Sequence, residues 1–364
     1  MNRTGIERRK ERGERRNGYA WLFLPLLFSF ALFSVTIAAQ VSFRMIQYNV
    51  ENLFDTVRSA VHNDADFTPE GKNHWTAGRY WIKLGNMARV IAAVGGTTPV
   101  DLVGMVEVEN ETVLNDLTKH TSLRSLGYEY CITQGKDERG INVALLYQPA
   151  KFKLLSAENL PVVVPEGMRP TRDVLKVEGM LPTRDTLTVF VVHFPSRRGG
   201  VGLSERYRSH VATVVREHID SIFVERPLAK VVVMGDMNAD MQSPCMAQGL
   251  KAKVLKSETV LAEGALYEAQ PATAFYEEVK GTYFFQNEWE QIDHILVSPS
   301  VVQSRTMKVS PEGWSIFDAS FLLDEKRKSA RKWNYPKRTY LGTNYQKGFS
   351  DHLPVVLQMQ LFFE

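Results

Sequence analysis

Short runs of apolar residues, many of them β-branched, recur along the chain and predict β-strands. The run Val231–Met234 is typical of a strand that is covered on both faces, and Gly235 after it permits a sharp turn into polar residues. The strands that these patterns predict are Phe43–Val50, Leu102–Val108, Tyr128–Thr133, Asn142–Tyr147, Leu187–His193, Val231–Gly235, Gln291–Val297 and Leu353–Leu361.

Two segments between these strands carry apolar residues at helical spacing and predict helices over Arg79–Val94 and Ser204–Glu225. Ile82 is expected on the buried face of the first helix, and Ser204 is expected to cap the start of the second. Strands that alternate with helices and hairpins indicate a layered α/β domain. Since no internal repeat or long linker follows residue 40, residues 40–364 are expected to form one domain.

The N-terminal segment, residues 1–39, differs from the remainder of the chain. It has a net charge of +4, which leaves −1 for residues 40–364 of a chain whose total is +3. Residues 20–39 are uncharged and mostly apolar, and they follow a basic stretch, which predicts a secretory signal cleaved near Ala39. The alternative is an uncleaved membrane anchor, because about 20 apolar residues can span a bilayer. Either reading places the domain outside the cytoplasm, in the periplasm or the extracellular space.

Composition narrows the chemistry that the domain can perform. Because residues 40–364 are close to neutral, attraction for a polyanion must come from local basic patches or from a bound metal. The chain has two cysteines, Cys131 and Cys245, which are too few for a cysteine-rich zinc site. One disulfide or two buried thiols fit the sequence equally well.

Polar side chains capable of catalysis recur at the ends of the predicted strands. Any one of them could be a loop residue that satisfies its own backbone. A whole set is harder to explain by packing, since buried charges are costly unless they are paired or bind a metal. We therefore expect the following residues to form one site: Asn49, Glu51, Glu107, His193, Asp236, Asn238, Asp293, Asp351 and His352.

In this order and spacing the set resembles the endonuclease/exonuclease/phosphatase superfamily. That superfamily includes deoxyribonuclease I, exonuclease III-type repair nucleases, sphingomyelinases and inositol polyphosphate phosphatases. The resemblance spans residues 41–358. It implies a four-layered α/β sandwich of two packed mixed β-sheets flanked by helices, with the site at one end of the sheets. It also implies hydrolysis of phosphate esters with Mg²⁺, or with Mn²⁺ as the alternative cofactor.

The resemblance assigns metal ligands among the oxygen-bearing residues. Glu107 is implied as the principal ligand, and Asn49 and Asp351 as supporting ligands. Hard oxygen donors of this kind suit Mg²⁺ or Mn²⁺. Glu51 stands where many members of the superfamily carry aspartate, so no ligand role is carried over to it.

The resemblance also assigns catalytic roles. His352 is implied as the acid–base histidine that contacts the phosphate, held in one tautomer by Asp293. Asp236 would orient or deprotonate the attacking water, and Asn238 would donate a hydrogen bond to the phosphate in the transition state. His193 resembles the second histidine of the deoxyribonuclease I branch, which supplies a proton to the leaving group, and so points away from exonuclease III-type nucleases.

Basic residues near these motifs are candidates for substrate binding. Arg139, Arg197 and Arg198 are expected to include at least one phosphate ligand. The segment 324–347, just before Asp351, holds eight basic residues, two acidic residues and four aromatic residues. Such a segment suits a polyanion whose bases can stack, and we expect it at the mouth of the site. The alternative is a solvated run of charge.

Three functions are compatible with these patterns. The first is an exported, non-specific endonuclease that acts on DNA or RNA. The second is a sphingomyelinase-like enzyme or another small-molecule phosphodiesterase or phosphatase, although no uninterrupted apolar hairpin supports lipid contact. The third is a non-catalytic binding module, which would have no use for the paired carboxylates and histidines. No protein partner is evident, and we expect a monomer.

Overall fold

The computed structural model describes residues 40–197, 200–269, 272, 274–309, 311–328 and 331–363. The predicted export segment, residues 1–39, lies outside these ranges, as does Arg198. From Ala38 to Glu364 the chain forms one compact unit. Within the described ranges no helix combines the length and apolar character that crossing a bilayer requires. Cys131 and Cys245 are both free thiols, so the two do not form a disulfide.

The first of two mixed β-sheets brings together the start and the end of this unit. Its strands follow the order β14-β20-β1-β2-β4-β3, and β15 also pairs with β20. Strand β1 runs parallel to β2 and antiparallel to β20. The strands are β1 (Gln40–Leu53), β2 (Leu102–Val108), β3 (Glu129–Ile132), β4 (Asn142–Tyr147), β14 (Met307–Lys308), β15 (Trp314–Ile316) and β20 (Val355–Phe362).

The second sheet is built from the middle of the chain, in the order β5-β6-β7-β8-β13-β10-β9. Strand β8 lies beside β7 in parallel and beside β13 in antiparallel orientation. The strands are β5 (Lys153–Leu160), β6 (Val174–Met180), β7 (Thr186–His193), β8 (Lys230–Asp236), β9 (Ala252–Val254), β10 (Leu266–Glu268) and β13 (Asp293–Val297).

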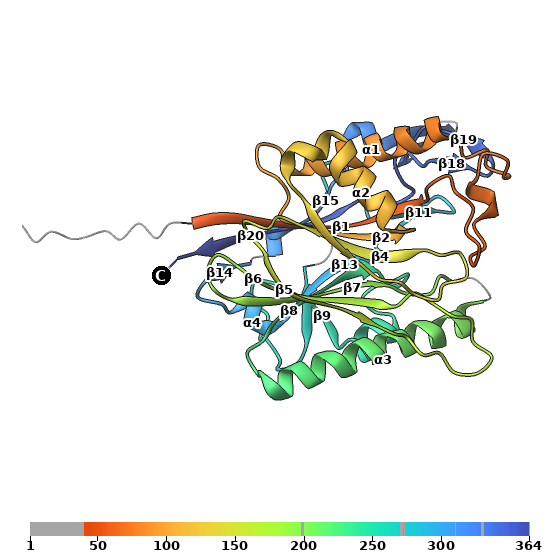
Figure 1. The fold of residues 1–364 in the computed structure, drawn as a ribbon. Coiled ribbons are helices and arrows are strands. Elements are labelled where there is room, and N and C mark those ends of the chain that lie inside the picture. Colours follow the sequence, from red (N-terminus) through yellow and green to blue (C-terminus); the bar gives the residue numbers. More distant parts are fainter. Residues whose placement is uncertain are drawn as a thin grey trace, which may run out of the picture. The chain divides into compact units, whose positions relative to one another are not determined.

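Helices cover the outer faces of the two sheets (Figure 1). Helices α1 (Ala77–Gly95) and α2 (Glu111–His120) lie on the first sheet, and α3 (Val201–Glu225) lies on the second. A short helix, α4 (Pro299–Val302), follows β13. The four-layered α/β sandwich that the sequence predicts is therefore confirmed.

The alternation of side chains along β8 shows how one strand serves two cores. Val231 and Val233 belong to the apolar cluster that β8 shares with α3. Val232 and Met234 belong to the larger cluster, which includes residues of both sheets and of α1 and α2. Since neighbouring residues of a strand point to opposite faces, a strand that is apolar at every position is needed in a sheet covered on both sides.

All eight predicted strands are present, with ends shifted by a few residues. Two predictions about the helices are wrong in detail. Helix α3 begins at Val201, so Ser204 lies inside the helix and does not cap it. On α1, Ile82 is 43% exposed, while the neighbouring Lys83 is buried.

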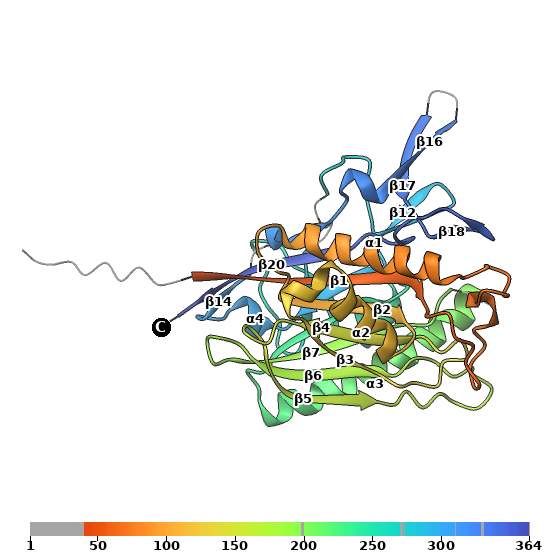
Figure 2. The same cartoon turned by 45° about the horizontal axis from the view of Figure 1, so that its top comes forward.

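Three two-stranded hairpins lie outside the main sheets. Their strands are β11 (Tyr283–Phe285) with β12 (Glu288–Glu290), β16 (Leu323–Lys328) with β17 (Arg331–Pro336), and β18 (Tyr340–Leu341) with β19 (Asn344–Tyr345). The β16–β17 hairpin stands away from the sandwich (Figure 2). It contains the first half of the basic and aromatic segment 324–347.

Gly235 allows β7 and β8 to approach closely just before Asp236. A Cβ atom at this position would lie 1.9 Å from the carbonyl oxygen of Val192, which is far inside any allowed contact. The backbone of β8 would have to move to accept it. The absence of a side chain at Gly235 therefore allows β7 and β8 to pack closely beside Asp236.

We predict that Gly235→Ala lowers the free energy of unfolding by about 1–3 kcal/mol, because the added methyl group overpacks a rigid backbone contact. Gly85→Ala is the matched control, since Gly85 is exposed on α1 and no atom lies within 4 Å of its added Cβ. The control is expected to raise the unfolding free energy by up to about 1 kcal/mol. Urea denaturation of both variants measures the difference, and equal stability of the two would contradict the prediction.

Candidate active site

The register of the second sheet aligns three of the predicted residues in one row. Asp236 at the end of β8 pairs with His193 on β7 and with Asp293 on β13. All three side chains are buried. Because β13 runs antiparallel to β7 and β8, its first residue meets the last residues of the other two strands. Polar residues that end two apolar runs and begin a third are therefore neighbours in the sheet.

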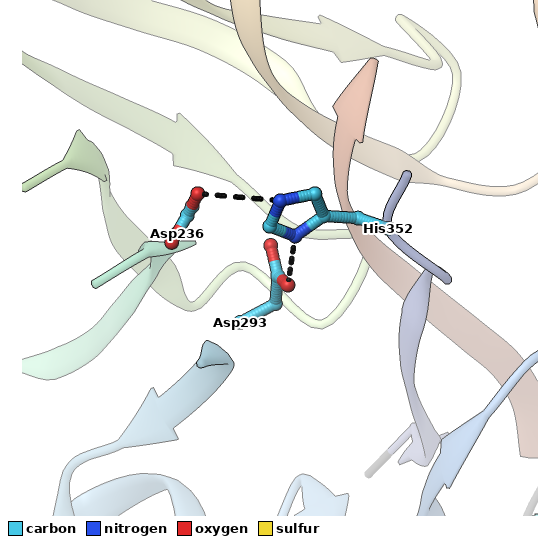
Figure 3. Close-up of side chains that lie close together, drawn as sticks. All are labelled: Asp236, Asp293 and His352. Carbon is cyan, nitrogen blue, oxygen red and sulfur yellow. Dashed lines mark hydrogen bonds and ion pairs between the residues drawn. The ribbon is translucent and has the colours of Figure 1, made fainter. Parts of the chain in front are cut away.

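His352 joins this row from the loop before β20 (Figure 3). Its Nδ1 lies 2.7 Å from Oδ2 of Asp293, and its Nε2 lies 3.8 Å from Oδ2 of Asp236. Ser350 fixes the loop, since its hydroxyl donates to the backbone oxygen of Asn49 at 2.6 Å and accepts from the backbone N–H of His352. The imidazole is thus oriented from one side and leaves Nε2 facing the site.

The carboxylates around His352 keep it charged. Burial alone would lower the pKa of His352, but the charge and hydrogen bond of Asp293, together with the charge of Asp236, raise it to about 10. At neutral pH the ring is therefore an imidazolium that donates from both nitrogens. Such a group can stabilise negative charge on a phosphate oxygen.

Asp236 is held by neighbours from both sheets. Its Oδ2 accepts from Nδ2 of Asn49 at 3.0 Å, and its Oδ1 accepts from the backbone N–H of Asn238 at 2.9 Å. Burial and the nearby charge of Asp293 raise the pKa of Asp236 to about 7. A carboxyl group with a pKa near neutrality is suited to exchange a proton with a water molecule.

Glu107 reaches the site from a bulge in the first sheet. The register between β2 and β4 shifts between Val106 and Val108, and Glu107 at the shift has a φ angle of 67°. Its Oε2 accepts from the backbone N–H of Asn52 at 2.8 Å. Its Oε1 has longer contacts, 4.0 Å to Nε2 of His193 and 3.9 Å to Arg139. The bulge directs a carboxylate toward the row on the second sheet.

His193, unlike His352, is neutral. Burial, with the positive charges of Arg172, Arg139 and His352, holds the pKa of His193 well below its usual value. Its Nε2 lies 3.6 Å from Oδ2 of Asp236. The structure thus contains one charged and one neutral imidazole beside the same carboxylate.

Three further predicted residues, the catalytic candidate Asn238 and the substrate-binding candidates Arg197 and Arg139, lie at the edge of the site. Asn238 adopts a left-handed backbone with φ of 48°, and its amide donates to the backbone oxygen of Phe194. Nη1 of Arg197 donates to both carboxylate oxygens of Glu290 at 2.9 Å, and Nε of Arg197 donates to the backbone oxygen of Asn238. Arg139 is 38% exposed and faces Glu107.

Asp351 approaches His352 at Nε2, the nitrogen that also faces Asp236. Its Oδ1 is 4.0 Å from Nε2 of His352, and its Oδ2 accepts from Arg338 at 2.5 Å. Burial would raise the pKa of Asp351, but the charges of His352 and Arg338 hold it below its usual value. Glu51, close by, has a pKa raised to about 7 by burial and by the charge of Asp351.

Sequence reasoning missed four residues that support this arrangement: Lys83, Arg172, Thr282 and Arg338. The hydroxyl of Thr282 donates to Asp293 at 2.7 Å, and Arg172 donates to the backbone oxygen of Phe194 next to His193. Lys83 had a visible signal, since it shares a helical stripe with the buried Met87 and Val90. The sequence gives no comparable signal for Thr282.

The oxygen donors present fit a divalent cation. Carboxylate oxygens of Asp236 and Asp293 lie within 4.8 Å of each other, and Glu107 and Asp351 flank them. His352 lies in the same cluster, but as an imidazolium it has no free lone pair to offer a metal. Asp293 Oδ1 is buried and makes no hydrogen bond within the described part of the chain. A concentration of buried carboxylates raises the energy of each negative charge, and a bound cation relieves it. The predicted ligands Asn49, Glu107 and Asp351 remain a prediction.

Comparison with known proteins places these residues in context. Residues 44–361 match the family model described as "Endonuclease/Exonuclease/phosphatase family". No curated protein matches the sequence. Many solved structures share the fold, among them the following three. One is an endonuclease/exonuclease/phosphatase family protein from Bacteroides thetaiotaomicron, 16% identical, with a TM-score of 0.53 over 90% of this chain and 97% of that chain.

The second is a mannosyl-6-phosphatase from the same species, 16% identical, with a TM-score of 0.51 over 87% of this chain and 99% of that chain. The third is truncated TDP2 from Caenorhabditis elegans, 13% identical, with a TM-score of 0.52 over 89% of this chain and 98% of that chain. At 13–16% identity, the similarity to these structures shows a shared fold alone.

We predict that Asp293→Asn lowers hydrolysis of a phosphate ester by about 100-fold or more, because His352 loses the charge that orients it and keeps it protonated. Initial rates on bis(p-nitrophenyl) phosphate measure the loss. In parallel, NMR titration of the His352 ring is expected to show a lower pKa than in the wild type, with the proton leaving as the pH rises.

Asp185→Asn is the control for this substitution. Asp185 forms an ion pair with Lys230, which begins β8, so it lies at the other end of the strand from Asp236. This variant is expected to keep its rate. A wild-type rate in Asp293→Asn would remove Asp293 from the mechanism.

Proposed function

The chain belongs to the endonuclease/exonuclease/phosphatase family, whose members hydrolyse phosphate esters, and we propose that it is an exported, divalent-metal-dependent endonuclease that cleaves phosphodiesters of DNA or RNA. The observation that carries this proposal is the continuity between the basic and aromatic segment 324–347 and the site. Arg338 in this segment contacts Asp351, and Tyr335 stacks on Phe284 of β11, with ring centroids 6.3 Å apart.

Oxygen ligands would hold the metal. Glu107, Asn49 and Asp351 would bind Mg²⁺, or alternatively Mn²⁺. The ion would polarise the scissile phosphate and offset charge on the leaving oxygen.

Side chains of the protein would activate the water and bind the phosphate and the leaving oxygen. Asp236, with its pKa near 7, would orient the attacking water and accept its proton. The charged His352 would bind a phosphate oxygen, and the amide of Asn238 would donate to the same group. The low pKa of His193 leaves its ring neutral at physiological pH, so it would donate a hydrogen bond to the leaving oxygen without giving up its proton.

Nucleic acid is the favoured substrate because of how charge is distributed. Segment 324–347 has six more basic than acidic residues, while residues 40–364 as a whole have a net charge of −1. Lysine and arginine beside aromatic rings suit a phosphate backbone with bases that stack. The second candidate is a small-molecule phosphodiesterase or phosphatase. One structural neighbour is named as a mannosyl-6-phosphatase, so this fold also serves small phosphate esters.

Export rests on residues 1–39, in which a basic stretch precedes the apolar residues 20–39. Cell fractionation followed by N-terminal sequencing tests this part of the proposal. Recovery of the intact chain in the cytoplasm would contradict it.

We predict that the purified full chain with Mg²⁺ nicks supercoiled plasmid DNA or degrades RNA, and leaves sphingomyelin and mannose 6-phosphate intact. EDTA is expected to abolish the activity and added Mg²⁺ or Mn²⁺ to restore it, because oxygen ligands bind these ions. Gel electrophoresis and phosphate release report the products. Glu107→Ala is the inactive control. Release from sphingomyelin or mannose 6-phosphate alone would favour the small-molecule candidate instead.

We further predict that replacing Lys326, Arg327, Lys328, Arg331 and Lys332 with glutamine weakens nucleic-acid binding and flattens its salt dependence, since each lost phosphate contact lowers the slope of log K against log salt by about 0.7–0.9. Fluorescence anisotropy with labelled oligonucleotides between low and moderate salt measures the slope. The same substitutions should leave the rate on bis(p-nitrophenyl) phosphate unchanged. An unaltered slope would separate this hairpin from substrate binding.

A further inference from the structure

A stripe of polar residues on α1 contacts residues 339–349, the segment that precedes Asp351 and His352. The stripe repeats at helical spacing, so its members lie on one side of the helix. Lys83 Nζ donates to Oγ1 of Thr339 at 2.6 Å, and Asn86 Nδ2 donates to the backbone oxygen of Gly348 at 2.7 Å. The guanidinium of Arg79 lies 4.5 Å from the ring centroid of Tyr345, and that of Arg89 lies 5.8 Å from the ring centroid of Phe349. The stripe consists of Arg79, Lys83, Asn86 and Arg89.

Arg338 directly precedes this segment and contacts two carboxylates of the site. Its Nη2 donates to Oδ2 of Asp351, and its Nε lies 3.9 Å from Oε1 of Glu51. The same Nε is buried and makes no hydrogen bond within the described residues. The next residue, Thr339, donates its backbone N–H to Oε2 of Glu51 at 2.6 Å. The backbone beside Arg338 is therefore fixed, while the guanidinium keeps donors to spare.

A cavity of about 260 Å³ lies beside Arg338. Its lining includes the charged residues Arg338, Asp351 and Glu51, together with Tyr340 and Asn52. The cavity adjoins the predicted metal ligand Asp351 and is large enough for a phosphate group. Arg338 thus borders both a carboxylate and a space that a substrate could enter.

We propose that Arg338 is a phosphate-binding residue that exchanges partners, leaving Asp351 for the substrate when a divalent cation binds Asp351. This inference rests on the metal-dependent hydrolysis proposed above. A guanidinium and a metal ion compete for the same carboxylate oxygens, and their like charges repel each other. The planar fork of arginine matches the geometry of a phosphate, and the spare Nε–H adds a donor.

Exchange of this kind couples the two ligands. The cation removes the carboxylate partner of Arg338, so phosphate binds more tightly once the metal is present. Removing Arg338 should therefore act in opposite directions on the two ligands. The metal binds more tightly because its competitor is lost, and phosphate binds more weakly because a donor is lost. A side chain that serves only to hold the fold together would not separate the two effects.

The experiment compares Arg338→Gln with the wild-type full chain by isothermal titration calorimetry. We expect the Kd for Mg²⁺ to fall by about 3–10-fold and the Kd for inorganic phosphate at saturating Mg²⁺ to rise by about 10–100-fold, the range for loss of a charged hydrogen bond. Arg338→Lys keeps the charge but loses the fork, so its phosphate affinity should lie between the two. This second variant tests the proposal if Arg338→Gln does not fold.

Arg226→Gln is the matched control, because Arg226 also pairs with a carboxylate, Glu178, but caps the far end of α3. It should change neither affinity. Unchanged phosphate affinity in Arg338→Gln would overturn the proposal, as would weaker Mg²⁺ binding. Since both probes are simple ions, these results do not depend on whether nucleic acid is the substrate, and failure of the nuclease assay would not affect them.

Discussion

Negative charge concentrated at one end of the sandwich is the constraint around which the site is organised. Carboxylates from both sheets meet there, away from the water that would screen them. Burial and mutual repulsion raise the pKa values of Glu51 and Asp236 to about 7. Three cations offset part of this charge from different directions: Lys83, Arg338 and His352. A site balanced in this way gains stability from any divalent cation that its oxygen donors accept.

Strand β13 shows how adjacent residues of one strand can take different roles. Asp293 faces the site and binds His352. The next residue, His294, points to the other face, where it pairs with Glu268 at 2.7 Å and contacts the backbone oxygen of Ala239 at 2.8 Å. Both are buried pairs of histidine and carboxylate, but the second one fixes the loop after β8. The same chemistry thus orients a reactive group on one face and supports it on the other.

Sequence patterns predicted the sheets and the row of polar residues because both depend on local order. Asp236 is recognisable where one apolar strand ends and Asp293 where another begins, and the antiparallel register of the sheet brings the two together. Ile82, and not Lys83, is predicted on the buried face of α1. Lys83 shares a helical stripe with Met87 and Val90, but that stripe does not reveal what would satisfy the buried ammonium group of Lys83. Its partners Thr339 and Phe349 lie more than 250 residues further along the chain, so only the folded structure shows that the ammonium group is satisfied. Contacts made by long, flexible side chains leave little trace in local sequence.

The left-handed backbone at the bulge that carries Glu107, and again at Asn238, places a side chain in a conformation that glycine adopts more easily. Selection for thermal stability alone would therefore favour glycine at these positions, and it would remove two side chains to which the proposed mechanism assigns metal binding and contact with the phosphate. On that mechanism, consensus redesign of this chain has to keep both residues, since stability and activity make opposite demands on the same positions.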